Sequence, residues 1–144
     1  MAPVENVVNG TLRIVGRVRS PWRTLDGIPV QGGEGVLEVA PEFEDALDGI
    51  ERASHLVVLA WLDRADRDVL VSRPRKLDPA APPCGVFASR APVRPNPIAL
   101  CVVRLVRREG LRLVVDPIDL LDGTPLVDIK SYGPGRDGVF SARL

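Results

Sequence analysis

The chain has 144 residues, and its 19 Lys and Arg residues balance its 19 Asp and Glu residues, so the formal net charge is zero at pH 7. This balance argues against general attraction to nucleic acid or to an anionic membrane, and any contact with RNA has to be local. The sequence holds no apolar run near the ~18 residues that a transmembrane helix needs, and it does not begin with a secretory signal pattern. We therefore expect a soluble, cytoplasmic protein with no membrane partner, in which residues 1–10 form a flexible leader and residues 11–144 a single domain.

The first half of the chain predicts two strands and one short helix. Residues 12–19 alternate apolar with mostly basic side chains, which is typical of a strand with one basic face. A loop rich in Pro and Gly follows over residues 21–34, and residues 35–40 read as a short strand. Residues 41–50 are expected to form a helix that plugs the core, because a proline suits the first turn and apolar residues recur at helical spacing. The apolar residues at that spacing are Phe43, Ala46, Leu47 and Ile50.

The second half predicts further short strands. They are expected over residues 55–62, 69–72, 98–107, 111–118, 126–130 and 139–143. The first of them is apolar almost throughout, which indicates either burial on both faces or a strand with one end at a site. Closing the sheet is the economical way to remove exposed strand edges. We therefore predict a mainly β fold, a small closed or nearly closed β-barrel of about eight strands with one or two short helices. The absence of βαβ alternation and of a GxGxxG motif argues against a Rossmann cofactor site.

A proline-rich segment over residues 85–97 is the most informative part of the chain. Each proline fixes its own φ and drives the preceding residue toward extended geometry, so the loop should present Arg90, Arg94 and Asn96 from a preformed shape. An arginine can bind a carboxylate through two parallel hydrogen bonds. The alternative is a solvated turn without function.

A second polar segment, residues 119–130, carries Asp119, Asp122, Asp128 and Lys130. Aspartate favours turns, and an Asp-Gly pair at 122–123 is a good turn signal, so turn chemistry can account for part of this pattern. Lys130 can pair with Asp128. Otherwise a carboxylate here accepts hydrogen bonds from ribose hydroxyls or from an amine. Together the two segments point to a polar, zwitterionic ligand, and a metal fits less well because the chain has one histidine.

The cysteines and the histidine carry weaker signals. Cys84 and Cys101 lack the CxxC spacing, and both are interpreted as small core residues rather than as a disulfide or a catalytic thiol. His55 is either a residue at a strand end or a general base, since its pKa range makes it eligible without selecting it.

Two long motifs match a known family. GVFASRAPVRPNPIAL at residues 85–100 and DLLDGTPLVDIKSYGP at residues 119–134, together with IVGRVRSP at residues 14–21, closely resemble the tRNA methyltransferase O (TrmO) family. The resemblance implies a small β-barrel that uses S-adenosylmethionine without a Rossmann fold and works as a homodimer. It also implies methylation of the exocyclic nitrogen of threonylcarbamoyladenosine beside the tRNA anticodon.

The resemblance also implies roles for residues. Those expected to bind the cofactor are Gln31, Phe87, Arg90, Arg94, Asn96, Asp119, Leu121, Asp122 and Thr124. Those expected to assist deprotonation of the acceptor are Asp128, Lys130 and Tyr132. Methyl transfer is an in-line displacement, so positioning can supply most of the rate.

The chain departs from the family pattern around these motifs. Residues 98–101 read IALC where the family usually has IGLS, and residues 130–134 read KSYGP where it has KPYIP. These changes and the zero net charge leave two alternatives open: the same barrel methylating a small metabolite, and a module that binds S-adenosylmethionine without catalysis.

Overall fold

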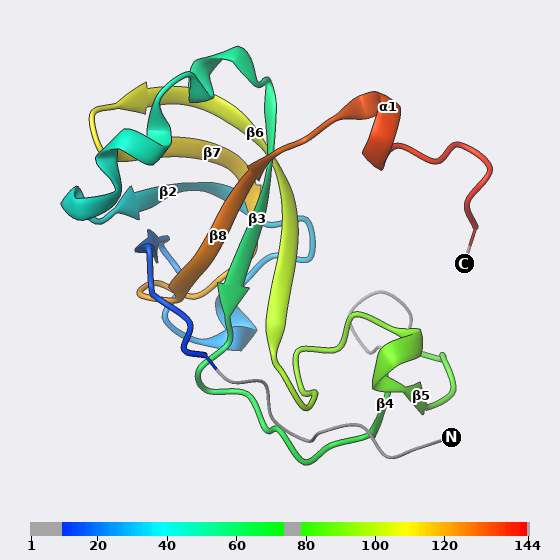
Figure 1. The fold of residues 1–144 in the computed structure, drawn as a ribbon. Helices are drawn as coiled ribbons and strands as arrows, with labels where there is room; N and C mark the ends of the chain where they lie inside the picture. The colour runs from blue at the N-terminus through cyan, green and yellow to red at the C-terminus, as the bar shows by residue number, and fades with distance from the viewer. Residues whose placement is uncertain (1–9, 74–78, 144) are drawn as a thin grey trace.

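Six strands close into a barrel in the computed structural model, which describes residues 10–73 and 79–143 (Figure 1). The order around the barrel is β1-β2-β7-β6-β3-β8, and every neighbouring pair is antiparallel. The barrel strands are β1 (Gly16–Arg19), β2 (Gly33–Val39), β3 (His55–Trp61), β6 (Ile98–Glu109), β7 (Arg112–Ile118) and β8 (Pro125–Ser131). A separate two-stranded sheet pairs β4 (Val71–Ser72) with β5 (Cys84–Gly85). The predicted mainly β fold with a closed barrel is confirmed. The predicted leader lies outside the described residues, apart from Gly10.

The core is built from the inward face of every barrel strand. The side chains with no exposed surface include Val18, Leu37, Leu56, Val58, Val103, Leu113, Val115 and Leu126. Full burial of each such side chain contributes about 1.5–3 kcal/mol. β3 alternates buried residues with half-buried ones, so the first of the two alternatives for this strand, burial on both faces, is wrong. Its outward neighbours on β6 are exposed because nothing among the described residues covers that face of the barrel.

The helix predicted over residues 41–50 forms as two 3₁₀ segments, η2 (Pro41–Leu47) and η3 (Ile50–Arg52). Gly49, at φ 81°, separates them. Leu47 is buried in the core, as predicted, but Ala46 is exposed. The physical reason is the tighter winding, because a 3₁₀ segment has three residues per turn and its faces fall at different positions from those of an α-helix.

The strand predicted over residues 139–143 is wrong. The chain instead makes a single helical turn, α1 (Pro134–Asp137), whose entrance is held by the Gly133 N–H donating to Asp137 Oδ2 at 2.7 Å. β8 is already paired with β1 on one side and β3 on the other, so the closed barrel offers no free edge to a further strand. Val139 and Phe140 are exposed beyond this turn.

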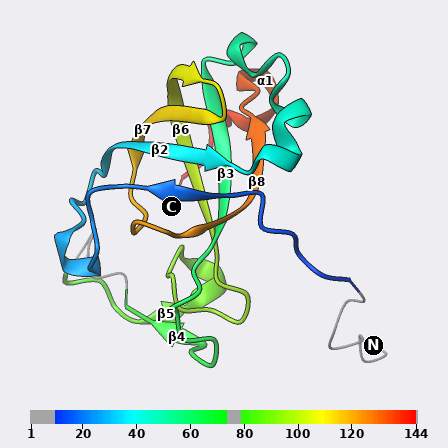
Figure 2. The same cartoon turned by 90° about the vertical axis from the view of Figure 1, so that its left-hand side faces the viewer.

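The barrel has two distinct ends, which two views at right angles separate clearly (Figures 1 and 2). We call the upper end the one with η2, η3, the β6–β7 turn and α1. The lower end carries β4, β5 and the short η4 (Val86–Ala88). Another 3₁₀ turn, η1 (Leu25–Gly27), lies in the connection between β1 and β2. No helix in the described parts of the chain has the length and apolar character needed to cross a membrane.

Candidate functional site

Three segments meet at the lower end of the barrel. We call them the proline loop (residues 86–97), the acidic turn (residues 119–124) and the N-terminal loop (residues 20–32). The proline loop leads into β6, the acidic turn connects β7 to β8, and the N-terminal loop leads into β2. Their meeting follows from the strand order, because β2, β7 and β6 are consecutive neighbours in the barrel.

The proline loop is braced from inside by Arg94. Its Nη1 donates to the carbonyls of Ala91 at 2.9 Å and Ser89 at 3.3 Å, and its backbone N–H donates to Asp66 O at 3.1 Å. Arg94 is half-buried. These contacts hold the loop in one shape, which complements the stiffness supplied by its prolines.

Asn96 lies in a contact that the sequence did not suggest. Arg67 donates through Nε to Pro95 O at 2.7 Å and through Nη2 to Asn96 Oδ1 at 3.1 Å. The same guanidinium carbon lies 5.3 Å from the centre of the Trp61 ring, within the range of a cation–π interaction. Arg67 therefore fastens the proline loop to the end of β3.

Arg90 reaches from the proline loop to the edge of β6. Its Nη2 donates to the backbone carbonyl of Leu100. β6 begins at Ile98, whereas its register with β7 begins at Arg104, opposite Asp116, so the first half of β6 presents backbone groups on that side. The exposed Arg90 side chain covers part of this edge.

Asp119 approaches the same place from the acidic turn. The Cys101 thiol lies 3.4 Å from Asp119 Oδ1. Burial first, and then the negative charge and hydrogen bond of Asp119, raise the pKa of the Cys101 thiol to about 12, while the nearby positive charge of Arg90 acts in the opposite direction. The thiol is therefore protonated at neutral pH and donates to the carboxylate. The expected convergence of the two segments is present within one copy of the chain, with Arg90 and Asp119 both close to Cys101.

Gly32 brings the N-terminal loop against this cluster. It has φ +68°, and a Cβ at this position would lie 2.5 Å from the carbonyl oxygen of Ile118. Only glycine accepts both the left-handed backbone and this close approach. The neighbouring Gln31 is exposed and precedes Gly32 at the point where the loop passes Asp119.

Asp122 and Thr124 shape the acidic turn through internal contacts. Asp122 Oδ1 accepts from the Ser20 N–H at 3.2 Å, and Ser20 Oγ donates to Leu120 O at 2.7 Å. Thr124 is 6% exposed, and its hydroxyl donates to Leu121 O at 2.7 Å. Turn chemistry, one of the alternatives for this segment, thus accounts for the contacts of Asp122 and Thr124, while Asp119 remains exposed.

Phe87 lies on η4 and is 83% exposed. Leu70 and Val71, close to it through the β4–β5 pair, are 64% and 62% exposed. The start of the proline loop and the neighbouring β4 segment therefore present exposed apolar side chains.

The three residues expected to act on the acceptor do not join this cluster. Lys130 Nζ lies 2.8 Å from Asp128 Oδ2 on β8, and the hydrogen bond and charge of Asp128 raise the pKa of Lys130. Tyr132 is at the upper end, where its N–H donates to His55 O at 3.0 Å and its ring centre lies 6.4 Å from the imidazole. His55 and Trp61 are the two ends of β3, a separation of roughly 20 Å at the usual rise of a strand.

His55 itself is exposed at the start of β3, with Nδ1 2.9 Å from Ser54 Oγ. Both cysteines are free thiols, and Cys101 packs against the core as expected, whereas Cys84 is half-buried on β5 and lies outside the core cluster. Among the residues that the structure describes, no group of three His, Cys, Asp or Glu side chains is placed to hold a metal ion.

Sequence reasoning missed several contributors to the lower end. Cys101 was assigned to the core, and it does pack there, but it also contacts Asp119. No sequence motif pointed to the Leu100 carbonyl or to Arg67. The one available signal was the IALC departure at residues 98–101, which contains both Leu100 and Cys101.

Comparisons with known proteins agree with this geometry. Residues 17–138 match the family described as the tRNA-methyltransferase O N-terminal domain. A crystal structure of TrmO is similar with a TM-score of 0.78 and 38% identity, covering 95% of this chain and 64% of that chain. Another, of TrmO from Pseudomonas aeruginosa, has a TM-score of 0.73 and 36% identity, covering 94% of this chain and 62% of that chain.

Two relatives from Archaeoglobus fulgidus bear names that refer to a ligand. One, "S-adenosyl-L-methionine-binding protein", is 44% identical over 133 residues, which are 89% of this chain and 93% of the relative. The other, "Probable S-adenosyl-L-methionine-binding protein", is 48% identical over 137 residues, which are 92% of this chain and 37% of the relative. The chain thus spans less than two thirds of several of the proteins it matches. On the match over residues 17–138 and the similarity to the solved structures, it belongs to the TrmO family.

Proposed function

We propose that the chain is an S-adenosylmethionine-dependent methyltransferase whose donor site is the lower end of the barrel, and whose acceptor is threonylcarbamoyladenosine beside the tRNA anticodon. The observation that carries the donor assignment is the convergence of Arg90 and Asp119 around Cys101. Membership of the TrmO family supports the acceptor. An acceptor in tRNA would place the protein in the cytoplasm.

The residues at the lower end fit the chemistry of the donor. S-adenosylmethionine carries a carboxylate, an ammonium, a sulfonium and ribose hydroxyls. The exposed Arg90 guanidinium suits a carboxylate, and the exposed Asp119 carboxylate suits an ammonium or a pair of hydroxyls. Gln31 adds an amide beside Asp119, and Phe87 an exposed ring. We assign these four side chains to donor binding, and Arg94, Asn96, Leu121, Asp122 and Thr124 to the shape of the loops that carry them.

The chain's contribution to the reaction is mainly orientation. The bound cofactor supplies an electrophilic methyl group. The braced proline loop and the Gly32 contact hold the binding groups in place before the ligand arrives, which lowers the entropy lost in reaching a reactive geometry. Asp128 is the group suited to accept the acceptor's proton, because the raised pKa of Lys130 keeps that lysine protonated.

A homodimer would unite the two ends of the barrel. The outward face of β6 presents Ile98, Leu100 and Val102, which are 41%, 44% and 44% exposed, beside the half-buried Val57 and Leu59 of β3. A contiguous exposed apolar face of this kind favours contact with another protein surface. With a two-fold axis across these strands, Tyr132 of the partner subunit would lie beside the lower end of the first copy.

The relatives named only for binding S-adenosylmethionine favour a second candidate, a module that binds the cofactor without transferring its methyl group. In that case the Asp128–Lys130 pair is a surface ion pair with no catalytic role.

Incubation of the purified chain with methyl-labelled S-adenosylmethionine tests these proposals. One arm receives tRNA that carries threonylcarbamoyladenosine, another the same tRNA without that modification, and a third a metabolite extract. We expect label in the first arm only, located on the modified nucleoside by mass spectrometry. Label in the metabolite extract alone would mean that the acceptor is a small metabolite and not tRNA. Calorimetric binding of the cofactor with no label in any arm would support the binding module.

A further inference from the structure

We propose that the outer face of β1, β2 and β7 binds the phosphate backbone of RNA through a basic row made of Arg17, Arg19 and Arg112. This inference rests on the proposed RNA acceptor and says where the protein would hold it. The lower-end site does not use these residues, although the alternation over residues 12–19 already predicted a basic face.

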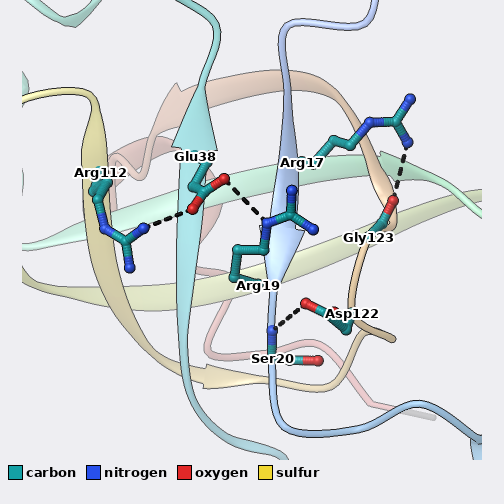
Figure 3. A network of polar contacts seen from close by, with 7 residues as sticks. All are labelled: Arg17, Arg19, Ser20, Glu38, Arg112, Asp122 and Gly123. Atoms are coloured by element: carbon teal, nitrogen blue, oxygen red, sulfur yellow. Dashed lines mark hydrogen bonds and ion pairs between the residues drawn. The ribbon is translucent and has the colours of Figure 1, made fainter.

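The basic row is ordered by the barrel register (Figure 3). Arg17 lies opposite Glu38 on β2, and Glu38 lies opposite Arg112 on β7. Arg19 Nε donates to Glu38 Oε2 at 3.0 Å, and Arg112 Nη1 donates to Glu38 Oε1 at 2.6 Å. One carboxylate thus holds two guanidinium groups side by side on the outside of the barrel.

The row keeps a positive excess and free donor capacity. The outer face carries these three arginines against two carboxylates of β2, Glu38 and the exposed Glu34, and the side chains of Arg19 and Arg112 are 46% and 49% exposed. A guanidinium has five N–H donors. The ion pair to Glu38 uses Nε of Arg19 and Nη1 of Arg112, so other donors of both groups can bind a ligand. Arginines ordered in this way lose less entropy when they bind phosphate.

The basic row is continuous with the candidate site. Arg17 Nη1 donates to Gly123 O at 3.1 Å, in the acidic turn (Figure 3). The strand that carries Arg17 and Arg19 continues into Ser20, whose N–H donates to Asp122 Oδ1 at 3.2 Å. An RNA strand whose phosphates follow the row therefore arrives at the turn that also contains Asp119. This path gives a neutral chain the local contact with RNA that its overall charge does not provide.

The test compares tRNA binding by the full chain and by single variants Arg17→Gln, Arg19→Gln and Arg112→Gln over a series of salt concentrations. Each substitution should weaken tRNA binding and make the negative slope of log binding constant against log salt concentration less steep by about one. Arg136→Gln is the control, because Arg136 is also exposed but lies on α1, outside the outer face of β1, β2 and β7. It should leave the slope unchanged.

Glu38→Gln gives a prediction of opposite sign. Removal of this carboxylate frees Arg19 and Arg112, so we expect tighter tRNA binding and a steeper salt dependence. Equal tRNA binding by all five variants and the wild-type chain would overturn the inference, as would equally tight binding of an acidic polypeptide such as polyglutamate. Calorimetric titration of S-adenosylmethionine into the same variants separates the two proposals, because donor binding should persist in every one even if the basic row proves inactive.

Discussion

The two ends of the barrel differ in how their polar side chains are connected. At the lower end, contacts join segments that are distant in the sequence: Cys101 meets Asp119, and Ser20 meets Asp122. At the upper end and along β8, most of them join near neighbours, such as Lys130 with Asp128 and Arg107 with Glu109.

The upper end has exceptions, such as the contact of Tyr132 with His55. Arg108 is another, because it donates to Leu47 O at 3.2 Å and to Glu51 Oε1 at 3.1 Å and so ties η2 and η3 to the hairpin. Contacts between distant segments restrict each other's positions, whereas pairs of exposed neighbours contribute little. The lower end is therefore organised before any ligand binds, whereas the upper end depends less on such contacts.

The largest effect on stability is expected at Gly32, and Gly110, which has a similar backbone conformation, serves as its control. Gly32 has φ +68° and faces the Ile118 carbonyl, whereas Gly110, in the upper β6–β7 turn, has φ +62° and nothing within 4 Å of its Cβ position. Gly32→Ala should lower the free energy of unfolding by about 3 kcal/mol, because backbone strain and a clash combine. Gly110→Ala should cost only about 1 kcal/mol, from strain alone. Urea denaturation measures both, and equal costs would contradict the close packing of the N-terminal loop.

The second effect concerns donor affinity. Arg90→Ala should weaken calorimetric binding of S-adenosylmethionine by about 1.5–3 kcal/mol, because a charge-assisted hydrogen bond is lost. Arg136→Ala, at an exposed position on α1, is the upper-end control and should have no effect. An unchanged affinity for Arg90→Ala would remove this arginine from the donor site.

A smaller effect should appear in the pH dependence of stability. Because the pKa of the Cys101 thiol is raised to about 12 in the folded chain, the thiol favours folding below its unfolded value of about 8.5, and this contribution is lost as the pH rises toward 12. Cys101→Ser removes the titration and keeps a donor for Asp119. Urea denaturation of both proteins from pH 7 to 11 should show a steeper loss for the wild-type chain. Parallel curves would contradict the burial of this thiol against Asp119.

The smallest effect is expected at the exposed ion pair on β8. Lys130→Met should leave the melting temperature and donor affinity unchanged, because such pairs contribute little to stability. It should still slow methyl transfer, since Lys130 is placed to orient Asp128. The control Arg107→Met, which breaks the ion pair with Glu109, should change neither the melting temperature nor the rate of methyl transfer. Normal transfer by Lys130→Met would exclude Lys130 from the reaction.

Local pattern explains which parts of the fold could be predicted. The strands predicted over residues 98–107 and 111–118 are present as β6 and β7, because two apolar runs and the turn residue Gly110 between them are encoded within a few positions. The prediction of a strand over residues 139–143 was wrong because β8 already pairs with β1, which leaves no free edge for another strand. That pairing joins residues far apart in the chain, so the local sequence does not reveal it.

The same limit applies to the site. The prolines and arginines of the proline loop were visible in the sequence, and the family resemblance implied that Arg90 and Asp119 bind the same cofactor. The role of Cys101 between them was missed, because a contact across 18 residues leaves no local pattern. The position of Tyr132 at the opposite end was missed for the same reason.

The most direct test of the central claim is a double-mutant cycle on donor binding with Arg90→Ala, Asp119→Asn and the combined variant. If the proline loop and the acidic turn form one donor site, both single variants weaken calorimetric binding of S-adenosylmethionine, and their effects differ from additivity by at least about 0.5 kcal/mol. If either single variant binds the cofactor as tightly as the wild-type chain, or if the two losses simply add, the two segments do not form a single site.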